Sequence, residues 1–208
     1  MRERPILFNT EMVQAILDGR KTCTRRVVKY DKADDALNSP ARKENPDIPD
    51  KQFIKCLVNK PYEAGDILYV RETWTDHYVP DKLGKPELQY CYKADGVDIK
   101  AECLPGENNR WYPSIHMPKK AARIWLKVTD VRVERLQDIM EDEPGPNNQV
   151  VKEGFDYGCD FIATWNSTIK KSDFDTYGWD SNPYVWVIEF ERFEKSGKEN
   201  SNETDRCR

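Results

Sequence analysis

The chain begins with apolar residues at the spacing of an amphipathic helix. Four of them would form one stripe of that helix: Met12, Val13, Ile16 and Leu17. Asn9 or Thr10 can cap its amino end, and Gly19 can end it. Residues 22–28 are rich in Thr and Val, which favours a strand directly after the helix.

Further along the chain, apolar residues alternate with polar ones or form the short runs that are typical of strands. On this basis we predict strands at residues 67–70 and 184–193, and a strand or hairpin at 124–133. Helical spacing predicts a short helix near 136–140 and a longer one at 161–169.

Two long stretches and the end of the chain lack such patterns. Residues of about 29–62 and 76–108 are predicted to be irregular insertions, the second with a short strand at 89–93. Residues 194–208 form a polar tail that we expect to be disordered. Strands joined by irregular connections, with few helices, favour one α+β domain or small barrel over residues 1–193.

The composition is that of a folded chain. Of its 208 residues, 38% are hydrophobic and 11% aromatic, which excludes wholesale disorder. The longest apolar run, 184–188, is far shorter than the ~20 residues of a membrane helix. The first residues also lack the apolar region of a signal peptide. We therefore expect a cytoplasmic monomer with no membrane partner.

Charge is unevenly distributed along the chain. The net charge of −4 argues against a protein that coats nucleic acid by bulk charge. Residues 19–30 and 108–129, however, each contain five basic residues and no acidic one. These windows indicate either a local positive field for an anionic or electron-rich ligand, or solvated strand edges.

Cysteine and histidine usage excludes several kinds of site. The six cysteines are scattered without a C-x-x-C pair, so we expect free thiols and no zinc site. His77 and His116 are the only histidines, and neither has a second ligand at helical spacing. We therefore predict no metal, no cofactor and no Ser-His-Asp triad.

The most specific motif covers residues 16–26, with the sequence Ile-Leu-Asp-Gly-Arg-Lys-Thr-Cys-Thr-Arg-Arg. It resembles the signature of the ASCH (activating signal cointegrator homology) domain family, G-x-K-x-x-E-x-R, in which a helix leads into a strand. Gly19, Lys21 and Arg26 match this signature. Thr24 stands where many members carry Glu.

Four segments in the same order resemble phage- and prophage-type members of that family: residues 5–27, 64–74, 113–118 with the strand after them, and 182–192. The resemblance implies a PUA-like small β-barrel with flanking helices. It also implies RNA or a modified nucleoside as the partner.

The resemblance leaves two functions open. ASCH domains resemble RNA-binding modules, which implies recognition of RNA or a modified nucleobase in a basic cleft. A small bacterial branch, in which Thr replaces the signature Glu, hydrolyses N4-acetylated cytidine with a Lys, a Thr and a Glu. That branch implies Lys21 as base, Thr24 as nucleophile and Glu153 as acid, with Glu72 as the alternative to Glu153.

Simple chemistry sets conditions on such a site. A Thr hydroxyl needs an adjacent base, and Lys21 can serve only if its pKa is lowered, for example by Arg20, Arg25 and Arg26. Strict strand alternation would put Lys21 and Thr24 on opposite faces, so Lys21 must lie in the turn before the strand. Alternatively, Lys21 and Arg26 only hold the helix–strand junction through carboxylate pairs.

The remaining candidates for ligand binding each have a structural alternative. They are Arg20, Arg26, Arg71, Glu72, Trp74 and His116. Arg71 and Glu72 form either an ion pair that orients the site or a plain salt bridge at a strand end. Trp74 either stacks on a base or belongs to the core, and His116 either binds a base or phosphate or is structural.

Overall fold

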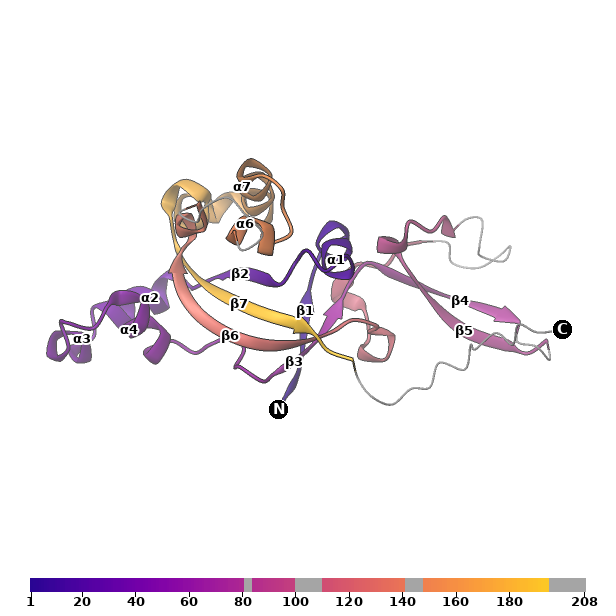
Figure 1. The fold of residues 1–208 in the computed structure, drawn as a ribbon, viewed down its shortest axis with the longest axis horizontal. Helices are drawn as coiled ribbons and strands as arrows, with labels where there is room; N and C mark the ends of the chain where they lie inside the picture. The colour runs from indigo at the N-terminus through magenta and orange to yellow at the C-terminus, as the bar shows by residue number, and fades with distance from the viewer. Residues whose placement is uncertain (81–83, 100–109, 141–147, 195–208) are drawn as a thin grey trace.

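The computed structural model describes residues 1–80, 84–99, 110–140 and 148–194. A five-stranded mixed sheet forms its centre, with the order β1-β3-β6-β7-β2 (Figure 1). The strands are β1 (Glu3–Leu7), β2 (Cys23–Val27), β3 (Ile67–Arg71), β6 (Trp125–Arg135) and β7 (Tyr184–Arg192). β1 and β3 are parallel, and the other neighbours are antiparallel. The predicted α+β class and its four main strands are confirmed.

Helix α1 (Thr10–Leu17) connects the two edge strands, β1 and β2. The Asn9 side chain accepts a hydrogen bond from the Met12 main-chain nitrogen at 2.8 Å, as expected of a cap. Gly19 ends the helix with a φ of +75°, a conformation that glycine adopts without strain. The prediction for this helix is confirmed.

The sheet is strongly curved but does not close within the described residues. A bulge between Val128 and Asp130 lets the long strand β6 bend (Figure 1). The edge strands β1 and β2 have no backbone ladder between them in the described part of the chain. A side chain connects them instead, because Arg26 Nη2 donates to the Leu7 carbonyl oxygen at 3.0 Å.

The first predicted insertion is helical, so the expectation of irregular structure was wrong. It contains α2 (Tyr30–Leu37), α3 (Pro40–Glu44) and α4 (Asp50–Leu57) at one end of the molecule (Figure 1). These helices are short and carry few apolar residues. They are stabilised mainly by packing of buried side chains such as Ala33, Phe53 and Ile54.

The second predicted insertion forms a β-hairpin at the opposite end, which also corrects the expectation (Figure 1). Its strands are β4 (Trp74–Pro80) and β5 (Pro86–Tyr92), and the short strand expected at 89–93 is part of β5. Trp74 packs against Tyr90 and Tyr112, which gives the hairpin a small core. Residues 100–108 of this insertion lie outside the described residues.

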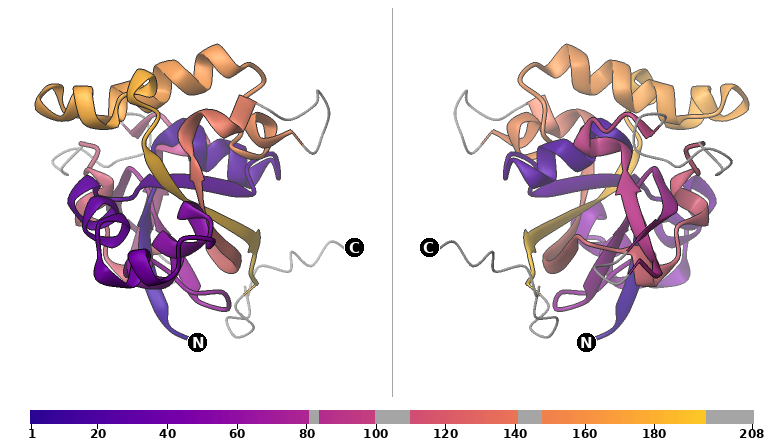
Figure 2. Two further views of the ribbon diagram at one scale, coloured as in Figure 1. Left: turned by 90° about the vertical axis from the view of Figure 1, so that its left-hand side faces the viewer. Right: turned by 90° about the vertical axis from the view of Figure 1, so that its right-hand side faces the viewer.

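Helical segments cover the sheet on the side of β2, as both side views show (Figure 2). They comprise α6 (Gln149–Lys152), α7 (Gly158–Thr168) and α8 (Phe174–Tyr177). Single 3₁₀ turns lie at Lys93–Asp95, Ser114–His116, Lys119–Ala121, Leu136–Met140, Lys171–Asp173 and Trp179–Ser181. The helices predicted near 136–140 and at 161–169 are therefore present, the first as a 3₁₀ turn.

Alternation along β7 separates two hydrophobic cores. Trp186 and Ile188 face the larger one, together with α1 and β6, whereas Val185 and Val187 face the smaller one beneath α7. No described helix is long and apolar enough to cross a membrane. The predicted disordered tail lies almost wholly outside the described residues.

Candidate functional site

The junction between α1 and β2 places Lys21 in a turn, not in the strand. The main-chain nitrogens of Arg20 and Lys21 both donate to the Ala15 carbonyl at 2.9 Å, which folds the chain back over the end of the helix. β2 begins two residues later, at Cys23. The geometric condition set by strand alternation is thus met, and the Lys21 side chain is fully buried.

Lys21 forms a buried ion pair with Glu153. Its Nζ donates to Glu153 Oε2 at 2.5 Å and to the Glu153 main-chain oxygen at 2.8 Å. Both residues are at most 3% exposed. Glu153 directly follows α6, and a hydrogen bond from Thr22 to the Lys152 carbonyl ties the two segments together. Lys21 therefore acts as the ammonium partner of a carboxylate in this state.

Arg25 binds the second oxygen of the same carboxylate. Its Nη1 donates to Glu153 Oε1 at 3.1 Å, and its Nη2 donates to Glu134 and Gln149. Burial raises the pKa of Glu153, but the charges of Lys21 and Arg25 together outweigh burial, so the pKa lies below its usual value. Glu153 is therefore ionised at neutral pH.

Thr24 lies beside this buried cluster and is oriented by Arg26. Arg26 Nη1 donates to Thr24 Oγ1 at 2.9 Å and to the Arg25 carbonyl at 3.0 Å. The Thr24 oxygen thus acts as acceptor, and no acceptor for its own proton is found among the described residues. The hydroxyl can still donate one hydrogen bond to a ligand or a base.

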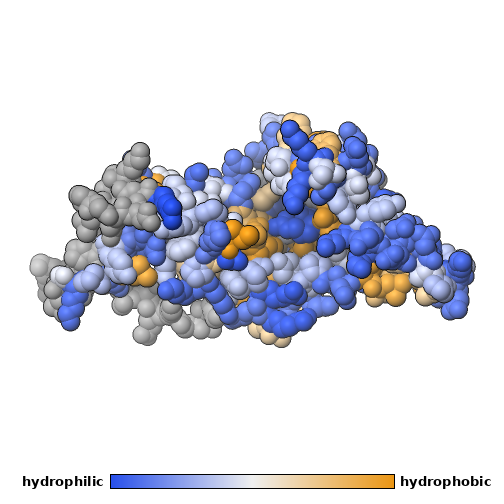
Figure 3. All heavy atoms as spheres, turned by 180° about the vertical axis from the view of Figure 1, so that it is seen from behind, coloured by the Kyte–Doolittle hydropathy of each residue, from blue (hydrophilic) through white to orange (hydrophobic). Residues whose placement is uncertain are grey.

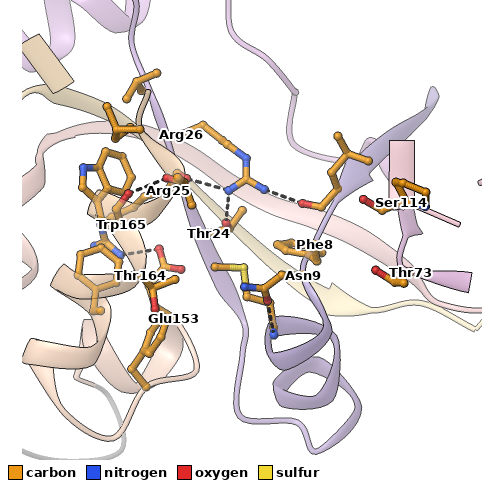
Figure 4. A pocket seen from close by; sticks show the side chains of 18 residues that line it. Phe8, Asn9, Thr24, Arg25, Arg26, Thr73, Ser114, Glu153, Thr164 and Trp165 are labelled. Atoms are coloured by element: carbon orange, nitrogen blue, oxygen red, sulfur yellow. Dashed lines mark hydrogen bonds and ion pairs between the residues drawn. The ribbon is translucent and has the colours of Figure 1, made fainter. Parts of the chain in front are cut away.

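These groups form the polar floor of a cavity of about 580 Å³. Thr24, Arg25, Arg26 and Glu153 line it, and Figure 4 shows them between Phe8 on one side and Trp165 on the other. Seen from behind, the molecule is hollowed below the helices that cover the sheet, where hydrophobic and hydrophilic surface meet (Figure 3). The volume falls within the range of small-molecule sites.

The position of β2 at the edge of the sheet explains why both of its faces contribute. Thr24 and Arg26 share one face of the strand, and Arg25 lies on the other. Because no strand of the described residues pairs with the outer side of β2, side chains from both faces border the same cavity.

The walls of the cavity are mostly apolar and come from distant segments. α7 contributes Phe161 and Trp165, and the end of β1 contributes Leu7 with its neighbour Phe8. Trp165 Nε1 donates to the Tyr177 carbonyl at 2.9 Å, which holds the indole ring in place. The sequence analysis did not identify these residues, since an apolar helical stripe predicts core packing and gives no sign of a cavity wall.

The structure separates Glu72 from Lys21. Glu72 is buried, and both of its carboxylate oxygens accept hydrogen bonds from Arg123 at 3.0 Å. Burial raises the pKa of Glu72, and Arg123 opposes that effect. The expected Arg71–Glu72 ion pair is replaced by this one, and Glu153 is the carboxylate that contacts Lys21.

The other candidates lie outside the cavity lining. Arg71 donates to the main-chain oxygens of Met117 and Ile115. Trp74 is buried in the core of the hairpin, and His116 is exposed. Arg20 is exposed as well, and it donates to the Gly154 carbonyl at 3.0 Å on the outer side of the junction.

The described residues of this site are poorly suited to metal binding and to catalysis by a cysteine nucleophile. Within the described ranges, no cluster of three or more His, Cys, Asp or Glu side chains is arranged to hold a metal. Burial and the adjacent Glu153 raise the pKa of Cys23 to about 12, so its thiol stays protonated and is a poor nucleophile.

Comparisons with protein-family models, curated proteins and solved structures found no match to this chain. Membership of the ASCH family therefore stays a sequence-based hypothesis. The geometry of the cavity is the basis for assigning a function.

Proposed function

We propose that the cavity beside Thr24 binds a modified nucleobase, carried by a nucleoside or by RNA. The observation that supports this most directly is the combination of a polar floor and aromatic walls in a cavity whose volume suits a small molecule. A nucleobase has apolar faces and a polar edge, so its faces would lie against the walls and its edge on the floor.

The floor offers both kinds of hydrogen-bonding group that a base edge requires. The Thr24 hydroxyl can donate and accept, Arg26 donates, and the Glu153 carboxylate accepts. The Trp165 ring, held by its bond to Tyr177, provides a flat surface for stacking. Stacking of one base on an aromatic side chain contributes roughly 1–3 kcal/mol.

The curved sheet favours a PUA-like architecture for this site. Its edge strands approach each other closely enough for Arg26 to contact the Leu7 carbonyl. We therefore propose that the sheet is an open variant of the PUA-like barrel, with the ligand bound where the edge strands meet.

Binding of N4-acetylcytidine and of cytidine, measured by isothermal titration calorimetry, tests the proposal. We expect saturable binding that Thr24→Val weakens about fivefold, since one hydrogen bond of roughly 1 kcal/mol is lost from the polar floor. Thr129→Val is the matched control because Thr129 is exposed and does not line the cavity. Absence of saturable binding by both nucleosides would refute the proposal.

A second function, hydrolysis of an N4-acyl group, is favoured by the Thr24 hydroxyl and the Glu153 carboxylate, which line the same cavity, and by the contact of Glu153 with Lys21. Passage of one proton across the 2.5 Å hydrogen bond converts this ion pair into a neutral amine and a neutral carboxyl group. This transfer costs free energy, because Lys21 and Arg25 hold the pKa of Glu153 below its usual value, so it would have to accompany attack on a bound acyl group. A single proton transfer would thus provide both a base and an acid.

The reaction would then proceed in two balanced steps. For this, the Lys21 amine must turn toward Thr24, because in the structure its Nζ donates to Glu153. It then takes the Thr24 proton while Oγ1 forms a bond to the acyl carbon, and the carbon–nitrogen bond breaks as Glu153 protonates the leaving N4 amine. Water then attacks the acyl-Thr24 ester and releases the carboxylic acid and Thr24. Arg26, which now donates to Oγ1, is placed to donate to the acyl oxygen as charge develops on it.

Release of acetate from N4-acetylcytidine tests this second function. We expect turnover that is retained in part by Thr24→Ser and lost in Thr24→Val, with an acetylated Thr24 peptide detected by mass spectrometry early in the reaction. Turnover no greater than that of Lys21→Ala would exclude hydrolysis and leave the binding proposal standing.

A further inference from the structure

A second cavity lies directly beside the first one. Its volume is about 610 Å³, and it is enclosed by β2 and the helical insertion that contains α2 and α4. Arg26 and Val27 line both cavities, so the two are adjacent along one wall.

The two cavities differ in whether their basic side chains already have partners within the protein. In the first, Arg25 is bound to Glu153 and Glu134, and Arg26 donates to Thr24 and to two carbonyl oxygens. Those positive groups are already neutralised or satisfied, which suits an uncharged base.

The second cavity contains lysines without counterions. Lys29 and Lys32 are exposed and form no ion pair among the described residues. Asp35 is the single acidic residue among the described residues that line it. Together with Arg26, these two lysines give the lining more positive than negative side chains, on a chain whose net charge is −4.

A third hollow continues from the second. It shares Val58 and Asn59 with the second cavity, and its lining includes four basic residues and one acidic residue. The basic residues are Lys51, Lys55, Lys60 and Arg132. Figure 3 shows mostly hydrophilic surface over this end of the molecule, where the helical insertion lies. Lys51 and Lys60 are paired with Asp138 and Glu63, and Arg132 is paired with three carboxylates, so most of the positive charge of this hollow is neutralised within the protein.

We infer that the second cavity binds the phosphate groups attached to the nucleoside in the first cavity. The ligand is then a nucleotide, either as part of an RNA strand or free, and the helical insertion supplies the phosphate site. Lysine side chains bind phosphate as point charges, and such contacts carry affinity without reading sequence. This inference rests on the proposed recognition of a nucleobase by the first cavity.

Calorimetric titration with four ligands tests the inference: N4-acetylcytidine, its 3′-monophosphate, its 5′-monophosphate, and an RNA pentamer with N4-acetylcytidine at its centre. We expect a phosphate-bearing ligand to bind at least about tenfold more tightly than the nucleoside at low salt, since two lysines contact phosphate. If a monophosphate and the pentamer gain the same affinity over the nucleoside, a free nucleotide is a sufficient ligand. If only the pentamer gains affinity, the ligand is an RNA strand.

The variant Lys29→Ala/Lys32→Ala should remove that gain while leaving nucleoside affinity unchanged. Loss of two phosphate contacts should also reduce the slope of log affinity against log salt by about 1.4 for a single strand. Lys93→Ala/Lys120→Ala is the matched control, because it removes the same charge from exposed positions outside these cavities.

Two results would overturn the inference and are distinguishable. If the nucleoside binds and phosphate adds no affinity, or if both double variants weaken the pentamer equally, the phosphate site is excluded and the nucleobase site stands. If neither the nucleoside nor any phosphate-bearing ligand binds, the proposed function fails, and the inference fails with it.

Discussion

Lys21 and Glu153 lie 132 positions apart in the chain, and their side chains meet at 2.5 Å in the protein interior. Arg25 occupies the other oxygen of the same carboxylate. A buried charge is tolerated only when it is paired, so each member of this cluster requires the others. The contact ties the turn after α1 to the end of α6, and thereby shapes the floor of the cavity.

Removing the lysine of this pair should destabilise the fold strongly. Lys21→Met keeps most of the side-chain volume but leaves Glu153 with Arg25 alone, and we expect a loss of about 3–5 kcal/mol in the free energy of unfolding. Urea denaturation followed by circular dichroism measures it. Lys127→Ala, which breaks the exposed pair with Glu191, should cost at most about 1 kcal/mol. Equal losses in the two variants would contradict a buried pair.

The lowered pKa of Glu153 predicts a specific dependence of stability on pH. A carboxyl group whose pKa is lower in the folded chain stabilises the fold above its unfolded pKa of about 4.3, and loses that contribution as the pH falls through its folded pKa. The difference in unfolding free energy between the wild type and Glu153→Gln should be largest near pH 7 and shrink below about pH 4.3. A constant difference across that range would show that Glu153 is not an ionised partner.

Gly154 is predicted to tolerate no side chain. Its φ is +91°, and a Cβ there would lie 2.9 Å from the Ala15 Cβ and 3.2 Å from the Lys21 Cβ. Gly154→Ala should lose about 1–2 kcal/mol through backbone strain and a further 1–3 kcal/mol through overlap. Gly96→Ala has a similar φ of +72° with open space around it, so only the strain applies. Thermal or urea unfolding of both variants compares the two effects.

Cysteine reactivity should follow burial. Cys23 is fully buried with a pKa of about 12, whereas Cys56 and Cys159 are exposed. Iodoacetamide at pH 8 should therefore modify Cys56 and Cys159 in the native protein and spare Cys23, since the thiolate is the reactive form. Peptide mass mapping reads out each site. Rapid native modification of Cys23 would mean that the cluster around Glu153 opens.

Trp165, which lines the first cavity, and Trp74, which lies in the core of the hairpin, should differ in their effect on ligand binding. Trp165→Leu removes an aromatic wall of the cavity and should weaken N4-acetylcytidine binding by about 1–3 kcal/mol. Trp74→Leu alters the core of the hairpin, outside the cavity, and should leave that affinity unchanged. Calorimetry compares the affinities of the two variants for N4-acetylcytidine, provided that each has a native circular dichroism spectrum. A larger loss of affinity in Trp74→Leu than in Trp165→Leu would point to the hairpin as the binding surface.

Several features of the site were predictable because they depend on short stretches of chain. The cap at Asn9, the end of α1 at Gly19 and the strand after it follow from local spacing and backbone preferences. The need for Lys21 to precede the strand follows from strand alternation.

The partners of the charged side chains were decided by the tertiary structure. Nothing in local spacing distinguishes Glu153 from Glu72 as the neighbour of Lys21, and only folding pairs Glu72 with Arg123. The helices α2, α3 and α4 of the first insertion were not predicted from the sequence for a related reason. Their few apolar residues stabilise a helix only when packed against the rest of the molecule.

The sequence by itself determined the secondary structure around the α1–β2 junction and the type of chemistry available there, because helix caps, glycine turns and strand alternation act over a few residues. The tertiary structure alone decided which carboxylate meets Lys21, that Trp165 forms a cavity wall, and that Lys29 and Lys32 line the neighbouring cavity. Those contacts join segments far apart in the chain, and they depend on how the curved sheet and its helices pack.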